Sequence, residues 1–404
     1  MFIPPEICGK IADEIRDNSL ESQRHKKKKE WDRENETLVA LTLVSRTWMR
    51  EAIRALWSEI FITERKTVEL SDASASRILG LLRDPETHYA TFLRRLVILQ
   101  PDPSFGLSTV SAGLASTIQQ IISISTQVQC LRIYCVNRTT LVLNHLSSSR
   151  FPHLRTLRLG VLQSNKEEQQ HLATFLLAHP RLQETRIKKG FGPFDWSSLQ
   201  KSNPLPELEW FEGRLSQLRL LSSSQHLQRV KCVNEMDTFQ FISELSYWSN
   251  PFAKVTHLTI SSAHIPFVAD VVRALGKTFP SLQKLSGLQI SPDFLTFMGS
   301  KLEDLSRCLP QLRQLYLTET KCGKSHSMSW GDAFLTADDE SMKNAFSALR
   351  RLFPAIEFAQ NYRRNRFAGA SKTMKFFYSS TSYRAVLTEK RRSSPEPAVA
   401  VEDE

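Results

Sequence analysis

The sequence predicts an α/β protein in which a helical N-terminal domain is followed by an irregular solenoid of alternating strands and helices. Two patterns predict it. Apolar residues recur at helical spacing near the N-terminus, and a short apolar motif then returns about ten times along the chain. We expect a helical domain over residues 1–62 with a basic insert at 18–37, a solenoid with a C-terminal cap over 63–386, and a disordered tail over 387–404.

The first predicted helix lies in the segment IPPEICGKIADEI. Pro4 and Pro5 suit a first helical turn, where the missing N–H group would have had no intrahelical partner. Ile7, Ile11 and Ile15 then recur at every fourth position, which places them on one face of the helix. An apolar face of this kind indicates contact with the rest of the domain or with a partner.

The second helical stretch is LVALTLVSRTWMREAIRALWSEIFI, Leu38 to Ile62. Its apolar positions have the spacing of consecutive helices, and they include Leu41, Val44, Trp48, Ala52 and Leu56. The two helical stretches are separated by the insert, NSLESQRHKKKKEWDREN. We expect the insert to form a surface loop, because lengthening such a loop costs little free energy.

Three motif blocks in these stretches resemble the F-box, the module through which substrate adaptors of cullin-RING ubiquitin ligases bind their Skp-type linker subunit. The family's Leu-Pro-x-Glu-Leu appears as IPPEI at residues 3–7, and its Leu-Val-x-Arg-x-Trp as LVSRTW at 43–48. Its closing Leu-Trp-x-x-apolar-x-apolar appears as LWSEIFI at 56–62. The chain departs from the family at the insert, where F-boxes normally have a short turn.

The resemblance implies a non-catalytic adaptor of an SCF-type E3 ubiquitin ligase, which docks on the Skp-type subunit and binds a protein substrate through the rest of the chain. The residues that it assigns to the Skp-type partner are Ile3, Pro4, Ile7, Ile11, Leu43, Val44, Trp48 and Trp57. The alternative is that these side chains fill the core of an ordinary helical domain, as amphipathic stripes usually do.

Composition is ordinary for a globular protein, with 41% hydrophobic and 24% charged residues. The six cysteines have no zinc-like spacing, the N-terminus has no signal-peptide pattern, and no apolar run is long enough to span a membrane. We therefore expect an intracellular protein, cytoplasmic or nuclear, with reduced thiols and no membrane contact. The absence of HExxH, GxSxG, paired CxxC and phosphate-loop motifs leads us to expect no catalytic residue, cofactor or metal.

The repeated motif is apolar-x-x-apolar-x-apolar. Its copies start at residues 57, 93, 128, 154, 182, 208, 227, 255, 282 and 312, and those at 182, 208 and 282 are the weaker ones. In five copies a proline stands two residues before the start, where it ends the preceding helix and needs no ladder donor. Amphipathic segments lie between the copies, so each repeat predicts a strand followed by a helix.

Such a unit resembles a degenerate leucine-rich repeat. The family's Asn or Cys after each strand is absent, which predicts an irregular solenoid whose turns are satisfied in another way. The alternative is a general α/β fold whose strands merely recur.

Basic residues gather at two outward positions of the copies, between the apolar ones. They are Arg95, Arg132, Arg158, Arg186, Arg229 and Lys231. We expect them to form a ridge that receives an acidic or phosphorylated segment of the substrate, because guanidinium groups bind carboxylates and phosphates with paired hydrogen bonds. The alternative is that they only keep exposed strand positions soluble.

The net charge of +11 leaves two further functions open. One is a repeat-based scaffold outside ubiquitylation, in which the F-box no longer binds its partner. The other, which we consider less favoured, is nucleic-acid binding by the basic and aromatic stretch from Arg363 to Tyr378. The run His25–Lys29 could act as a nuclear import signal or as a solvated loop.

Overall fold

A computed structural model of the chain describes residues 3–22, 28–63, 71–99, 112–135, 146–161, 166–187, 204–221, 224–233, 236–248, 250–261, 265–290, 294–299, 305, 307–320, 339–365, 370–379 and 382–391. The chain is a mixed α/β protein, which confirms the α/β part of the predicted fold class. It divides into two compact units, Met1–Leu208 and Glu209–Glu404.

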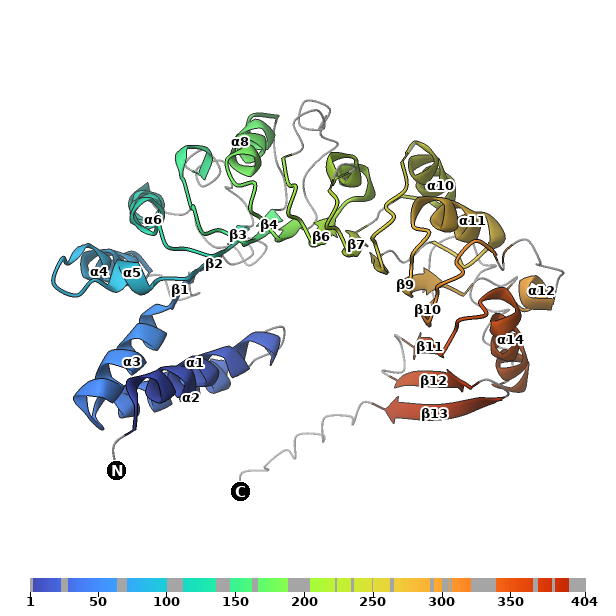
Figure 1. Cartoon of the computed structure of the whole chain (residues 1–404), viewed down its shortest axis with the longest axis horizontal. Helices are drawn as coiled ribbons and strands as arrows, with labels where there is room; N and C mark the ends of the chain where they lie inside the picture. Colours follow the sequence, from blue (N-terminus) through green and yellow to red (C-terminus); the bar gives the residue numbers. More distant parts are fainter. Residues whose placement is uncertain are drawn as a thin grey trace, which may run out of the picture. The chain divides into compact units, whose positions relative to one another are not determined.

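The first unit begins with three helices and continues with parallel strands. Its described elements are α1 (Pro5–Ser22), α2 (Lys28–Thr42), α3 (Arg46–Trp57), β1 (Glu59–Thr63), α4 (Ser71–Arg83), α5 (Tyr89–Phe92), β2 (Arg95–Leu99), α6 (Ala112–Ile124), β3 (Cys130–Cys135), β4 (Thr156–Val161), α8 (Lys166–Leu177) and β5 (Glu184–Ile187). Helices α4, α6 and α8 lie on one side of the strands (Figure 1).

The insert differs from the expected surface loop. Helix α1 continues to Ser22 and α2 begins at Lys28, so helical structure takes up most of the insert. The insert is rich in Lys, Glu and Arg, which are good helix formers, and both helices extend into it. Residues 23–27, which include Lys26 and Lys27, lie outside the described residues.

Strands β1 to β5 pair in parallel in chain order, so equivalent positions of successive copies face each other. Leu96 lies opposite Leu131, and Leu131 lies opposite Leu157. All three are completely buried. Full burial of a leucine side chain contributes roughly 2 kcal/mol to the free energy of folding. Each copy therefore adds this stability only when its strand pairs with the next strand in this register.

The second unit consists of parallel strands closed by an antiparallel pair. Its described elements are β6 (Trp210–Gly213), the 3₁₀ helix η2 (Leu215–Leu221), β7 (Arg229–Val233), α10 (Thr238–Ser246), β8 (His257–Ser261), α11 (Ala269–Thr278), β9 (Lys284–Gln289), α12 (Phe294–Gly299), β10 (Gln314–Thr320), α14 (Asp339–Leu352), β11 (Phe358–Asn365), β12 (Ala370–Tyr378) and β13 (Tyr383–Arg391). Helices α10, α11, α12 and α14 lie on one side of its strands (Figure 1).

Each of the ten predicted copies contains a strand, β1 to β10 in order. Strand β11 pairs in parallel with β10 and is not predicted by the repeat, because Ala359 and Asn361 stand at two of its apolar positions. Two antiparallel strands, β12 and β13, follow β11 where a C-terminal cap was expected. Phe376 of β12 is buried and stacks on Phe346 of α14, with ring centroids 4.3 Å apart.

The end of the second unit differs from the predicted boundary. Strand β13 runs to Arg391, so residues 387–391 belong to the sheet rather than to a disordered tail. Antiparallel pairing with β12 holds them, since Ala370 to Met374 lie opposite Arg391 to Leu387. The rest of the predicted tail, 392–404, lies outside the described residues.

The prolines of the repeat belong to tight turns before the strands. In the copy at 154, the carbonyl of Phe151 accepts the N–H of Leu154 at 3.1 Å, with Pro152 at the second turn position. Proline favours that position because its ring fixes φ near −65°. The same bond precedes the other proline-marked strands and joins residues 179 and 182, 205 and 208, 279 and 282, 309 and 312, and 353 and 356.

One carbonyl at the start of each strand fixes the register. The carbonyl of Gln129 accepts the N–H groups of both Arg155 and Thr156, at 2.8 and 3.0 Å. Arg155 in turn accepts from Gln183 and Glu184 at 2.8 and 2.9 Å. In the second unit Glu209, Gln228, Thr256, Gln283 and Arg313 make the same double acceptance from the next copy. These bonds satisfy backbone N–H groups at the point where one strand begins beside the next.

The weak copy at 282 contains a bulge. Gly287 has φ 96°, and a Cβ atom there would lie 1.8 Å from the carbonyl oxygen of Ile260. Only glycine fits this close approach. Because of the bulge, Tyr316 of β10 lies opposite Ser286, but the next residue, Leu317, lies opposite Leu288. Leu288 is therefore the residue that is buried after the bulge.

His179 joins two successive turns of the first unit. It is 4% exposed, its Nε2 atom accepts the N–H of Phe151 at 3.0 Å, and its Nδ1 atom lies 2.6 Å from the carbonyl oxygen of Phe175. The ring must be neutral, with the proton on Nδ1, to make both bonds. Burial lowers the pKa of His179, and the charge of Arg150 lowers it further, although the bond to Phe175 acts in the opposite direction.

We predict that this histidine makes stability fall on acidification. Because the folded-state pKa of His179 lies below its unfolded value of about 6.5, the unfolded state gains the proton first. The free energy of unfolding should therefore decline as the pH falls below about 6.5. Urea unfolding between about pH 7 and pH 5 measures this decline, and His179→Gln should reduce it. His226→Gln, at an exposed histidine, is the control. An unchanged pH slope in His179→Gln would contradict the prediction.

Candidate functional site

The three N-terminal helices pack through small side chains. Among the described side chains, the buried core between them is formed by Ala12, Leu38, Ala52 and Ala55, which are completely buried. Because three of the four are alanine, the helices approach closely and leave little interior room for large side chains. Bulky apolar residues of this region must therefore lie at its margin or outside it.

Close approach of α1 and α3 is also visible at Gly9. A Cβ atom at Gly9 would lie 3.1 Å from the Glu51 carboxylate and 3.6 Å from Arg54. The Arg54 side chain bonds to Asp13 and Glu51, each at 2.9 Å, and donates to the carbonyl of Gly9 at 3.4 Å. Burial opposes the charged form of Arg54, but the two carboxylates outweigh it and raise its pKa. The contact fixes α1 against α3.

Large apolar side chains lie exposed on the outside of these helices. Seven of the twelve exposed large hydrophobic residues in the described part of the chain belong to the first 49 residues. They are Ile3 (38% exposed), Ile7 (47%), Ile11 (40%), Val39 (52%), Leu43 (85%), Val44 (63%) and Met49 (43%). We call this set the N-terminal apolar set. Exposed apolar residues concentrated in one small region mark a surface for protein contact.

The Leu43–Val44 segment is exposed because a helix boundary falls there. The N–H groups of Leu43 and Val44 bond back to Ala40 and Leu41, which ends α2. Ser45 then caps α3: its Oγ atom accepts the N–H of Trp48 at 3.3 Å. Serine is a favoured residue at this cap position, so the local sequence produces the sharp turn that presents both side chains.

Five of the eight residues assigned to the Skp-type partner are large apolar side chains that lie exposed: Ile3, Ile7, Ile11, Leu43 and Val44. Pro4 is also exposed, and Trp48 is half-buried. Trp57 differs, because it stacks on Tyr89 of α5 with ring centroids 4.2 Å apart and so packs within its own unit.

Two members of the N-terminal apolar set, Val39 and Met49, are not among the eight assigned residues. Val39 could have been predicted from the sequence, because it precedes Leu43 by four residues and so lies on the same helical face. Met49 follows the LVSRTW block directly and carries no comparable signal.

The predicted basic ridge divides into separate rows. Arg132, Arg158 and Arg186 lie opposite each other on β3, β4 and β5. Arg95 belongs to the neighbouring row, with Glu59 on one side and Cys130 on the other. Arg229 is exposed on β7, beside Trp210 and His257, and Lys231 occupies the next row of that strand.

Carboxylates accompany most of these cations. Glu184 lies 2.9 Å from Arg158 and 2.5 Å from Arg186. In the same way Lys231 lies 2.5 Å from Glu212, and Arg95 lies 4.0 Å from the buried Glu59. Arg186 is only 8% exposed. These four side chains do not form the open cationic ridge that we expected, because the strand register brings an acid beside each of them.

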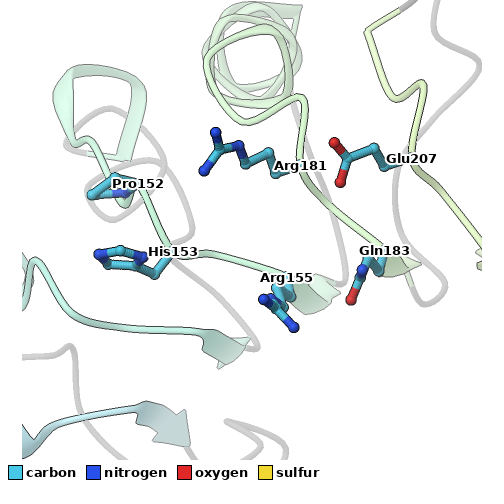
Figure 2. A pocket seen from close by; sticks show the side chains of 6 residues that line it. All are labelled: Pro152, His153, Arg155, Arg181, Gln183 and Glu207. Carbon is cyan, nitrogen blue, oxygen red and sulfur yellow. The ribbon is translucent and has the colours of Figure 1, made fainter.

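A shallow cavity of about 320 Å³ lies at the turns before β4 and β5. Figure 2 shows its lining, in which Arg181 is flanked by Glu207 on one side and by Pro152 and His153 on the other. Arg155 and Gln183 complete it. The cavity is formed by successive turns of the repeat. Its cations are not those of the predicted ridge.

No known protein family model matches this chain, and no curated protein matches its sequence. Within the described residues, no helix is long and apolar enough to cross a membrane. In the same part of the chain, His, Cys, Asp and Glu side chains do not gather into a group that could hold a metal ion.

We predict that Glu184 matters for stability because Arg186 is buried beside it. Glu184→Gln removes the negative charge and leaves the guanidinium in a poorly hydrated place, which should cost about 2 kcal/mol of unfolding free energy. The exposed pair of Glu340 and Lys343 provides the control, and Glu340→Gln should cost less than about 0.5 kcal/mol. Urea unfolding measures both. Equal costs for the two variants would contradict a structural role for Glu184.

Proposed function

We propose that the chain is a substrate-recognition adaptor of an SCF-type E3 ubiquitin ligase. In this proposal helices α1 to α3 form an F-box that docks on a Skp-type subunit. The strand and helix repeats that follow form a leucine-rich-repeat-like solenoid that binds a protein substrate. The chain contributes no chemistry of its own: it holds the substrate close to a ubiquitin-charged enzyme and raises the effective concentration there.

One observation carries the proposal. Four large apolar residues of the first two F-box-like blocks, Ile3, Ile7, Leu43 and Val44, are exposed, although an ordinary amphipathic domain would bury them. Among the described side chains, Ala12, Leu38, Ala52 and Ala55 form the core of the three helices, and Ile7, Leu43 and Val44 lie outside it. An external apolar partner would remove them from water, which favours docking by roughly 25 cal/mol for each Å² of apolar surface buried.

The third block supports a connecting role. Its helix ends at Trp57, and β1 begins two residues later at Glu59. The carbonyl of Ser58 accepts the N–H groups of Arg94 and Arg95, each at 2.9 Å, so the helix end is joined to the first pair of strands. A short, hydrogen-bonded connection of this kind would hold the proposed docking helices firmly against the first repeats.

A repeat-based scaffold outside ubiquitylation is the second candidate. The exposed N-terminal apolar set fits it as well, since any apolar partner could cover these side chains. The two candidates differ in one respect: only the adaptor binds a Skp-type subunit.

The test is capture of a purified Skp-type subunit by the full chain. The intact chain should capture it, and Ile7→Glu combined with Val44→Glu should weaken capture by at least about tenfold, because two charges would enter an apolar contact. Both side chains are at least 47% exposed, so the double variant should stay folded.

Phe239→Glu is the matched control, because Phe239 is an 81% exposed apolar residue of α10 in the second unit. It should leave capture unchanged. Failure of the intact chain to capture the subunit would exclude the adaptor and favour the scaffold. Equal capture by the intact chain and the double variant would show that the N-terminal apolar set is not the docking surface.

A further inference from the structure

The sheet face of β9 to β13 that points away from the helices carries aromatic and basic side chains. We define the aromatic-basic face as Lys284, Tyr316, Phe358, Lys375, Phe377 and Arg384. Strand register brings these residues together: Phe358 lies opposite Phe377, and Phe377 lies opposite Arg384. Lys375 shares the side of Phe377, because side chains alternate along a strand.

The rings of this face contact one another in a row. Tyr316 and Phe358 have ring centroids 5.3 Å apart, as do Phe358 and Phe377. The Lys284 ammonium group lies over the Tyr316 ring, 4.9 Å from its centroid. Phe377, at the other end of the row, is 45% exposed. The opposite side of β12 faces the core, where Met374 and Phe376 are buried.

Cations stand on both sides of the aromatic row. Lys284 is on β9, the rings are on β10, β11 and β12, and Lys375 and Arg384 are on β12 and β13. Strands lie about 4.8 Å apart, so the face from β9 to β13 is about 19 Å wide. That width matches roughly six residues of an extended chain crossing the strands.

The face has no acidic members to neutralise these cations. Besides the six, the residues on the same side whose side chains are described are Ser286, Gln289, Gln314, Thr318, Gln360, Tyr362, Thr373, Val386 and Thr388. None is Asp or Glu. This separates the face from the rows of the first unit, where Glu59 and Glu184 lie beside the arginines.

We propose that the aromatic-basic face binds an acidic peptide segment in which carboxylates or phosphates flank a large apolar side chain. The apolar side chain would lie on Phe358 and Phe377, whose edges and part-open faces form an apolar surface. Its acidic neighbours would pair with Lys284 on one side and with Lys375 and Arg384 on the other.

Ring geometry favours a peptide over single-stranded nucleic acid. Stacking of bases needs open, flat ring faces. Here Phe358 and Phe377 meet edge to face at 64°, and Lys284 covers Tyr316. Two of the three rings are therefore covered in part, and the surface suits a side chain of irregular shape better than a planar base.

This inference rests on the proposed function in one respect, since it names the substrate class of the adaptor. The binding itself does not need a ligase. The chain can therefore capture the Skp-type subunit without binding the peptide, and it can bind the peptide without capturing the subunit.

The test measures fluorescence anisotropy with the full chain and three labelled probes. The probes are a short peptide in which Glu alternates with Phe, the same peptide with Lys in place of Glu, and an oligodeoxythymidine strand. The Glu-Phe peptide should bind and the Lys-Phe peptide should not. Lys375→Glu combined with Arg384→Glu should weaken binding of the Glu-Phe peptide by at least about tenfold, since each reversed charge repels the ligand.

Two further variants keep the test decisive. Phe377→Ala should weaken binding about fivefold and, because the ring is partly exposed, should leave the unfolding temperature nearly unchanged. Lys277→Glu on α11, an exposed lysine on the helix side, is the matched control and should bind as the intact chain does. All variants should still capture the Skp-type subunit.

Three results would overturn the proposal. The first is equal peptide binding by the intact chain and the double charge reversal. The second is binding of both peptides alike, which would indicate apolar adhesion only. The third is tighter binding of the oligonucleotide than of the Glu-Phe peptide with loss in Phe377→Ala, which would assign the face to nucleic acid.

Discussion

The double hydrogen bond at the start of the parallel strands is the constraint on which the strands of both units depend. One carbonyl in each turn, such as that of Gln129 or Gln283, accepts two N–H groups from the next copy. This leaves neighbouring strands one register, and a slip by one residue would turn every buried leucine to the other face. Columns of buried side chains and rows of outward side chains both follow from it.

The outward rows explain why two regions of similar sequence differ in chemistry. In the first unit the register sets Glu184 beside Arg158 and Arg186, so both guanidinium groups share a carboxylate within the protein. In β9 to β13 the same arrangement aligns aromatic rings and cations without an acid. A residue's charge in the sequence therefore says little about binding until its neighbours across the strands are known.

The positions of the ten strands could be predicted from the sequence. Leucines recur at the buried positions of the strands, and prolines recur just before them. Strand β11 could not be predicted, since Ala359 and Asn361 hide the apolar pattern. The outward exposure of Ile7 and Val44 could be expected only from the F-box resemblance, because spacing alone does not distinguish a core stripe from a docking stripe. The acidic partners of the basic residues could not be predicted either. Glu212 and Lys231, for example, are distant in sequence and meet only through the strand register.

Hydrogen exchange of the full chain, with and without a purified Skp-type subunit, tests the central claim most directly. The account predicts that added partner slows exchange at the start of α1 and in the turn between α2 and α3, where Ile7, Leu43 and Val44 lie exposed. The strands of the second unit should exchange as before. Unchanged exchange in the N-terminal helices, or slowing confined to the second unit, would contradict it.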